Sequence, residues 1–253
     1  MTNALVTGAS RGIGRAIAQA LARRGDVVAV HFGSDAAAAQ ETLDSLPGSG
    51  HVLVRGDIAD AAAAQTIVAT AVSTLGSIDI LVNNAAVAPN VGNRHPAVGT
   101  SYTEWQQAWR QMIDVNLVGA ANITMLVAQH LIDQRRPGAV VNIGSRGAFR
   151  GEPDHPAYAA SKAGLHAFGQ TMAASLAPHG ISVTSVAAGF IATERQTPKL
   201  TGPAGDSIRD QSPFHRVGTP EEVANAVLYL TSPEAVWASG AVLDLNGASH
   251  FRT

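Results

Sequence analysis

The chain has 253 residues, of which 46% are hydrophobic and 14% charged, and its formal net charge is −2. This composition suits one large folded α/β domain or two small ones, and the lack of a basic run argues against nucleic acid or an anionic membrane surface as the main partner. The chain has no cysteine, which excludes disulfide bonds and thiolate metal sites.

Short apolar runs typical of strands alternate with longer alanine-rich runs typical of helices. The continuously apolar runs suit strands that are covered on both faces. Strands are predicted at 3–7, 27–31, 51–55, 78–83, 138–143, 181–187 and 241–245. Helices are predicted at 12–24, 35–46, 60–75, 103–134, 156–177 and 220–231. This alternation predicts an α/β fold: a single-domain Rossmann fold with a doubly wound, seven-stranded parallel sheet and helices on both faces.

The sequence also indicates where the protein is located and which segment could cover its site. No run of 18 apolar residues is expected to cross a membrane, and the N-terminus lacks the basic region of a signal peptide, so a soluble cytoplasmic protein is expected. The segment 190–215 carries Pro198, Gly202 and Pro213 and no helical pattern. Irregular segments this long are often functional lids, and we predict a lid over a substrate.

A glycine-rich turn links the first predicted strand to the first predicted helix. It reads Thr7-Gly8-Ala9-Ser10-Arg11-Gly12-Ile13-Gly14. Glycines let the backbone approach a pyrophosphate, and the N-terminus of the next helix offers free N–H groups. The turn therefore indicates dinucleotide binding. It also matches the G-x-S-x-G pattern of α/β-hydrolases, but too few residues precede it for the strands that such a nucleophile needs.

Tyr158 and Lys162 lie four residues apart in a predicted helix. This spacing places both side chains on one face of the helix. A tyrosine has a pKa of about 10, and a neighbouring ammonium lowers it. A phenol tuned in this way can exchange a proton with a carbonyl or alcohol oxygen.

Further polar motifs follow other predicted strands. They are Asp57-Ile58, Asn83-Asn84-Ala85-Ala86 and Val140-Val141-Asn142-Ile143-Gly144-Ser145, with Asp114-Val115-Asn116 in the long predicted helix. Together with the glycine turn and the Tyr/Lys pair, these motifs resemble the short-chain dehydrogenase/reductase family over essentially the whole chain. The resemblance is closest to its 3-oxoacyl-carrier-protein reductase-like members. Ala86 and Ala188 stand where the family usually has glycine and proline, which affects local geometry more than the proposed chemistry.

The resemblance implies four catalytic residues. Tyr158 would be the acid/base, and Lys162 would lower its pKa and hold the nicotinamide ribose. Ser145 would hydrogen-bond the substrate oxygen, and Asn116 would hold a water that links Lys162 to solvent. The reaction would be hydride transfer between NADP(H) and a carbonyl/secondary-alcohol substrate.

The resemblance also implies a cofactor site. Asp57 would bind the adenine amine, Asn84 would brace the site, and Ile191 and Thr193 would contact the nicotinamide amide and the phosphates. The full predicted set is Gly8, Ser10, Arg11, Gly12, Ile13, Gly14, Ser34, Asp57, Ile58, Asn84, Ala85, Tyr158, Lys162, Ile191 and Thr193.

The choice of cofactor depends on the end of the second predicted strand. NAD-preferring relatives usually carry an aspartate there, and this chain has Phe32. Arg11 and Ser34 could face a 2′-phosphate, and His31 could add charge, whereas Asp35 would oppose it. NADP is predicted, with NAD the alternative.

The remaining expectations concern substrate and assembly. Substrate choice is expected to depend on His95 and the rest of 87–101, on residues 146–153 and on the lid. Arg146 and Arg150 could favour an anionic or carrier-bound substrate.

Members of this family commonly form homotetramers through their long helices. No histidine pattern supports a metal site. Two alternatives stay open: an NAD-dependent alcohol dehydrogenase of the same family, and a non-catalytic nucleotide-binding sensor.

Overall fold

Seven parallel strands form one sheet in the order β3-β2-β1-β4-β5-β6-β7. The computed structural model describes residues 2–252. The strands are β1 (Asn3–Val6), β2 (Val27–Phe32), β3 (Val52–Arg55), β4 (Ile80–Asn83), β5 (Gly138–Ile143), β6 (Ile181–Ala188) and β7 (Val242–Leu245). This arrangement confirms the predicted α/β fold with its seven-stranded parallel sheet.

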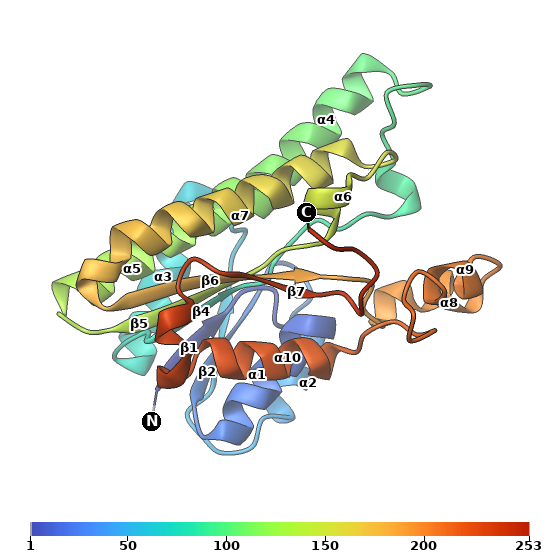
Figure 1. Ribbon diagram of the computed structural model, residues 1–253. Coiled ribbons are helices and arrows are strands. Elements are labelled where there is room, and N and C mark those ends of the chain that lie inside the picture. Colours follow the sequence, from blue (N-terminus) through green and yellow to red (C-terminus); the bar gives the residue numbers. More distant parts are fainter. Residues whose placement is uncertain (1, 253) are drawn as a thin grey trace.

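Helices cover both faces of this sheet (Figure 1). The helices α1 (Gly12–Arg24), α2 (Ala36–Asp44) and α10 (Pro220–Leu230) lie on one face. Helix α1 packs over β1 and β2, α10 packs over β5 and β6, and the two helices contact each other. The other face carries α3 (Ala61–Leu75), α4 (Tyr102–Ile113), α5 (Ala120–Asp133) and α7 (Pro156–Leu176). Each face therefore has its own apolar core, as the continuously apolar strands require.

Local capping explains where most of these helices begin. The Asp60 carboxylate accepts hydrogen bonds from the Ala62 and Ala63 amides at the start of α3. Thr219 and Glu222 form a capping box at α10, next to Pro220 in the first turn. Helix α1 differs, because its N-cap Arg11 makes no side-chain cap. The first amides of α1 thus remain available to a ligand.

The long predicted helix is continuous but irregular. A π-helical turn (Asp114–Gly119) joins α4 to α5. By length and composition alone, Tyr102–Asp133 could cross a membrane, contrary to the expectation that no stretch would qualify. In this fold the helix packs on α3 and α7, and 44% of its most apolar window is buried. Core helices of globular proteins pass the same test.

The segment 190–215 is more regular than predicted. It contains short helical pieces at Glu194–Gln196, α8 (Thr197–Thr201) and α9 (Gly205–Arg209). Figure 1 shows α8 and α9 standing beyond the edge of the sheet. A parallel bridge between Ile191 and Gly218 closes the base of this segment. The short helices were missed because prolines and glycines interrupt any apolar period there.

Candidate active site

The carboxyl ends of β1 and β4 meet at the point where the strand order reverses. The Thr7 hydroxyl accepts hydrogen bonds from the amides of Asn84 (2.9 Å) and Ala85 (3.1 Å). The Asn84 amide nitrogen in turn donates to the carbonyl oxygens of Thr7 (2.9 Å) and Gly8 (3.0 Å). These bonds tie the glycine turn to the end of β4, so Asn84 lies where it can brace a nucleotide site. Ligands of doubly wound folds bind at such a reversal.

His31, on β2, forms a hydrogen bond with the same glycine turn. Its Nδ1 accepts from the Gly8 amide (3.1 Å) and its Nε2 donates to the Gly56 carbonyl (3.0 Å). The side chain is only 2% exposed, and burial lowers its pKa to about 4. The expectation that His31 could add charge near a 2′-phosphate is therefore wrong. Its two ring nitrogens serve the fold as a neutral imidazole.

The glycine turn has the shape that an anionic group requires. Gly8 and Gly12 adopt φ values of 64° and 54°, a region that favours glycine. A side chain on Gly14 would collide with the Gly8 carbonyl oxygen. Ser10 and Ile13 complete the turn beside the uncapped N-terminus of α1. The amides of this turn and the positive end of the helix suit a pyrophosphate.

Thr193, which follows β6 in the chain, lies next to the same turn. A Cβ on Gly12 would lie 3.1 Å from the Thr193 methyl carbon. The Thr193 hydroxyl is buried and has no protein partner among the described residues. Neighbouring Ile191 is 7% exposed. A buried hydroxyl without a partner is unfavourable, so Thr193 fits a site completed by a polar ligand group.

The second and third strands form the other end of this site. Asp57 is exposed and accepts from the Ala59 amide (3.0 Å), whereas Ile58 buries its side chain in the core and could offer a ligand only its backbone. Ser34 is exposed after β2. The Arg11 guanidinium lies 3.2 Å from Asp35, and both side chains are partly exposed. The predicted nucleotide residues thus line one edge of the sheet.

Tyr158, Lys162 and Ser145 lie together at the end of β5. Tyr158 and Lys162 sit one turn apart on α7, and the Lys162 ammonium donates to the Ile143 carbonyl (2.8 Å). The Ser145 hydroxyl accepts from the Gly147 amide (3.0 Å) and acts as a hydrogen-bond partner of the Tyr158 phenol. The sheet and α7 therefore bring a phenol, an ammonium and a hydroxyl together.

Burial dominates the titration of this pair. It raises the pKa of Tyr158 above its usual value, although the Ser145 hydroxyl acts in the opposite direction. This direction is opposite to the predicted lowering, because desolvation disfavours the phenolate. Burial also lowers the pKa of Lys162 to about 8. The lysine charge is directed at the strand-end carbonyl.

Asn116 occupies the π-helical turn next to this cluster. Its Oδ1 accepts from the Val87 amide (2.7 Å), and its Nδ2 donates to the Val87 carbonyl (3.1 Å) and the Ser161 hydroxyl (3.0 Å). Both amide hydrogens are used and Oδ1 has one lone pair left, so a water at Asn116 would bind to Oδ1 or to the main chain. Such turns often mark functional sites.

Comparison with known proteins agrees with this geometry. Residues 8–250 match the family described as enoyl-(acyl carrier protein) reductase. The 3-oxoacyl-[acyl-carrier-protein] reductase of Staphylococcus epidermidis is 33% identical over 251 residues, covering 98% of this chain and 99% of the relative. The chain belongs to the short-chain dehydrogenase/reductase family.

Two other curated relatives carry the same printed name. The protein of Synechocystis sp. is 34% identical over 247 residues, covering 96% of this chain and 95% of its own. That of Vibrio cholerae is 33% identical over 249 residues, covering 98% and 97%. Membership of this family makes the chain an NAD(P)-dependent oxidoreductase that acts on a carbonyl or alcohol group of a small molecule.

His166 is a residue near the site that the sequence analysis did not identify. It follows Lys162 by one turn of α7, and its Nε2 accepts weakly from the Ser145 amide (3.4 Å). Burial lowers the pKa of His166 to about 4, and the Lys162 charge acts in the same direction. Its spacing of four residues from Lys162 and eight from Tyr158 is a signal that could have placed it on this face.

The predicted lid contributes charge to the site. The Arg195 charge lowers the pKa of both Tyr158 and Lys162. Further along the segment, the Lys199 ammonium donates to the Pro89 carbonyl (3.3 Å), which joins the 190–215 segment to the 87–101 loop. The sequence predicts that this segment is a lid, but no local pattern shows that Arg195 is the side chain whose charge acts on the site.

His95 does not face a substrate. It is 1% exposed, its Nδ1 donates to the Asn93 carbonyl (2.8 Å), and its Nε2 accepts from the Ala157 amide (3.0 Å). The expectation that His95 helps to select the substrate is therefore wrong. It caps the first turn of α7 and thereby holds the 87–101 loop against the helix that carries Tyr158.

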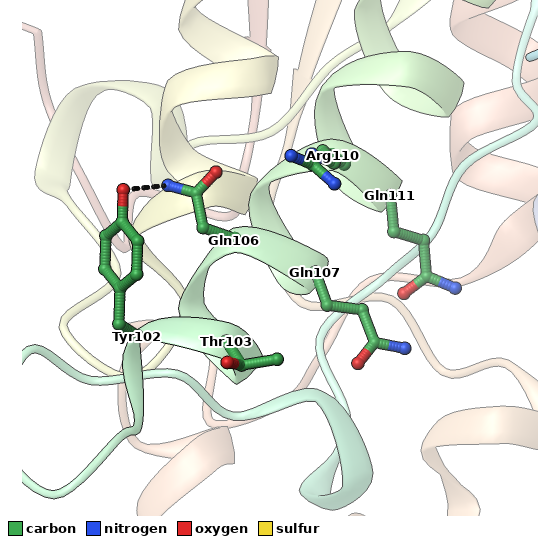
Figure 2. A pocket seen from close by; sticks show the side chains of 6 residues that line it. All are labelled: Tyr102, Thr103, Gln106, Gln107, Arg110 and Gln111. Carbon is green, nitrogen blue, oxygen red and sulfur yellow. Dashed lines mark hydrogen bonds between the residues drawn. The ribbon is translucent and has the colours of Figure 1, made fainter.

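A hollow of about 590 Å³ lies along α4, away from these residues. Figure 2 shows that its lining side chains, among them Gln107, Arg110 and Gln111, all come from α4, with the Gln106 amide donating to the Tyr102 hydroxyl at 3.2 Å. A hollow lined by one helix is a surface groove, and none of the predicted site residues lines it. Within residues 2–252, no group of three or more acidic or histidine side chains could hold a metal ion.

The buried histidines predict how stability depends on pH. Because the folded pKa values of His31 and His166 are lowered to about 4, the unfolded chain binds their protons first on acidification. The free energy of unfolding should therefore fall between about pH 6.5 and pH 4, on the order of 1–3 kcal/mol for each histidine. Urea unfolding across this range measures the slope.

The variant His31→Gln should show a shallower slope than the wild-type protein. The exposed His179→Gln serves as its control and should retain the full slope. Equal slopes in the His31→Gln and wild-type proteins would contradict a buried neutral imidazole at this position.

Proposed function

We propose that this protein transfers hydride between NADP(H) and a ketone or 3-oxoacyl substrate, with Tyr158 as the acid/base. The observation that carries the proposal is the convergence of Tyr158, Lys162 and Ser145 beside a glycine turn that suits a pyrophosphate. The whole chain would act as one NAD(P)-binding domain, with 190–215 as its lid.

In the reductive direction, Tyr158 donates its phenolic proton to the carbonyl oxygen. A bound nicotinamide cofactor supplies the hydride. Burial keeps the phenol protonated near neutral pH, while Ser145 and the Arg195 charge favour release of that proton. Ser145 also holds the substrate oxygen at the phenol. Catalysis then depends on positioning one proton donor, the half-buried Tyr158.

Lys162 and Asn116 complete this arrangement. The ammonium is 3% exposed and carries one hydrogen bond to the Ile143 carbonyl, which leaves donors for a ribose hydroxyl. Asn116 fixes Val87 at the start of the loop that faces the lid. Its Oδ1 or its main chain would hold the water that returns a proton to the site.

The relatives support the choice of substrate. Their printed names describe reductases of 3-oxoacyl groups on an acyl carrier protein, and their similarity to this chain extends over nearly its full length. The lid and the 87–101 loop, joined through Lys199 and Pro89, would enclose the acyl part. Such relatives and the net charge of −2 are also consistent with a location in the cytoplasm.

The proposal predicts that Tyr158→Phe abolishes proton transfer and leaves cofactor binding nearly unchanged. Turnover of a small β-ketoester with NADPH should fall by about 10²–10⁴-fold, while NADPH binding measured by fluorescence changes little. Tyr102→Phe, on the exposed face of α4, is the matched control and should retain activity. Full activity in Tyr158→Phe would refute the acid/base role.

If the wild-type protein binds nucleotide but turns over no member of a broad ketone and alcohol panel, the non-catalytic sensor becomes the better description. A preference for NADH in the same assay would favour the NAD-dependent alcohol dehydrogenase instead.

NADP is proposed because the end of β2 lacks an acidic side chain facing the ribose. Phe32 is buried there, and Arg11 and Ser34 are exposed beside it. Arg11→Gln should therefore weaken NADPH binding by about tenfold relative to NADH, since one charged hydrogen bond to the 2′-phosphate is lost. Asp35→Asn should act in the opposite direction, because it releases Arg11 from its ion pair.

Fluorescence titration with both nucleotides measures this ratio. Arg23→Gln, an exposed arginine near the other end of α1, is the control and should leave the ratio unchanged. An unchanged ratio in Arg11→Gln would contradict the proposed contact.

A homotetramer is proposed from two exposed apolar surfaces. Val118 and Met125 lie seven residues apart on the long helix, and Val236, Trp237 and Leu243 lie near the edge strand β7. Trp237 is 99% exposed. A tetramer with twofold symmetry needs more than one kind of interface, which two such surfaces could supply.

Light scattering after gel filtration should give about four times the 26.0 kDa mass of one chain. Met125→Glu and Trp237→Glu should each reduce the assembly to dimers, because each removes one interface. Val98→Glu, an exposed loop substitution, is the control. A wild-type monomer would refute the tetramer.

A further inference from the structure

A cavity of about 430 Å³ lies at the carboxyl edge of the sheet, beside the proposed catalytic cluster. It is enclosed by residues after β6, the end of the 190–215 segment, the start of α10 and the loop after β7. Asn116, Ser145, Tyr158 and Lys162 do not line it. Ile191 lines it, so the cavity adjoins the proposed cofactor site, but no proposed catalytic side chain faces this space.

Arg146 provides the charge in this cavity. The side chain is 5% exposed, and its two terminal nitrogens donate to the Ser249 hydroxyl and the Gln211 side-chain oxygen. Both acceptors are neutral, and within residues 2–252 no carboxylate forms an ion pair with Arg146. A guanidinium carries five donors, so these two bonds leave capacity for an anion.

The nearby carboxylates are already paired with other arginines. Glu152 lies 3.5 Å from Arg150, and Glu222 lies 2.6 Å from Arg216. The charged residues that line the cavity are Arg146, Arg216 and Glu222, which leaves one positive charge in excess. Burial lowers the pKa of Arg146, but an arginine keeps its charge. A buried charge without a counter-charge is costly, and an anion would relieve that cost.

The rest of the lining indicates what kind of anion fits. Phe190, Ile208 and Phe214 supply apolar surface, and Asn225 and Asn246 supply amide groups. The volume falls within the range of small-molecule sites. The planar fork of Arg146 suits two carboxylate oxygens, while the apolar wall suits a hydrocarbon body.

We propose that this cavity is a second ligand site, which binds a small organic carboxylate with its head on Arg146 and its apolar body against Phe190, Ile208 and Phe214. The site is distinct from the one that binds the reacting carbonyl. Because Arg146 directly follows Ser145 and Gln211 belongs to the 190–215 segment, an occupant would also fix the end of that segment against β5.

Calorimetric titration and thermal unfolding of the full chain test the proposal without requiring turnover. Sodium hexanoate is the probe, hexanamide is its neutral counterpart, and inorganic phosphate is the anion without an apolar body. Hexanoate should bind at least about tenfold more tightly than either and should raise the unfolding temperature. Because binding is measured directly, failure of the proposed reductase activity would not affect this result.

Arg146→Gln should weaken hexanoate binding by at least about tenfold, whereas Arg23→Gln, which removes an exposed arginine that does not line the cavity, should change it by less than about threefold. If Arg146→Gln does not fold, Ile208→Phe replaces it. That change fills the apolar wall, keeps the guanidinium and should weaken binding by the same margin.

Three results would overturn the proposal. Equal binding of hexanoate and hexanamide would show that the charge is irrelevant, and equal binding of phosphate would show that the apolar wall is irrelevant. Competition between hexanoate and the nucleotide or the carbonyl substrate would place the probe in the catalytic site instead.

Discussion

The hydrogen bonds between the glycine turn and the end of β4 are the constraint on which the site depends. Four hydrogen bonds join Thr7 and Gly8 to Asn84 and Ala85 across the point where the strand order reverses. The His31 ring accepts a further bond from the Gly8 amide. Without these bonds the backbone amides of the turn would be free to rotate away from the sheet edge. A rigid turn presents its amides and the uncapped N-terminus of α1 in one direction, which is what binding an anionic group requires.

The second part of the site is assembled by burial rather than by local spacing. Lys162 and Tyr158 share a face of α7, but burial determines how each group titrates, and the Ser145 hydroxyl and the Arg195 charge act as smaller causes. Burial pushes the two pKa values in opposite directions, up for the phenol and down for the ammonium. The phenol is therefore neutral near pH 7, and the Arg195 charge makes the loss of its proton less costly.

The loops around this cluster are tied to one another more than their sequences indicate. His95 caps α7, Lys199 reaches the 87–101 loop, and Arg146 connects the end of β5 to the 190–215 segment and to the loop after β7. Movement of one loop would therefore change contacts of the others. A carboxylate on Arg146 would act on this same set of contacts.

The sequence by itself determined the strands, the main helices and the motifs at the strand ends. The strand predicted at 181–187 is found at Ile181–Ala188, and the helix predicted at 60–75 is found at Ala61–Leu75, because apolar period and capping residues act within a few neighbours. Only the tertiary structure decided the roles of His31, His95 and Arg146, whose partners lie far along the chain or on other elements. Burial depends on which distant segments pack around a side chain, so no local pattern showed that the histidines are neutral and structural. The same reason explains why the direction of the Tyr158 pKa shift could not be read from its spacing to Lys162.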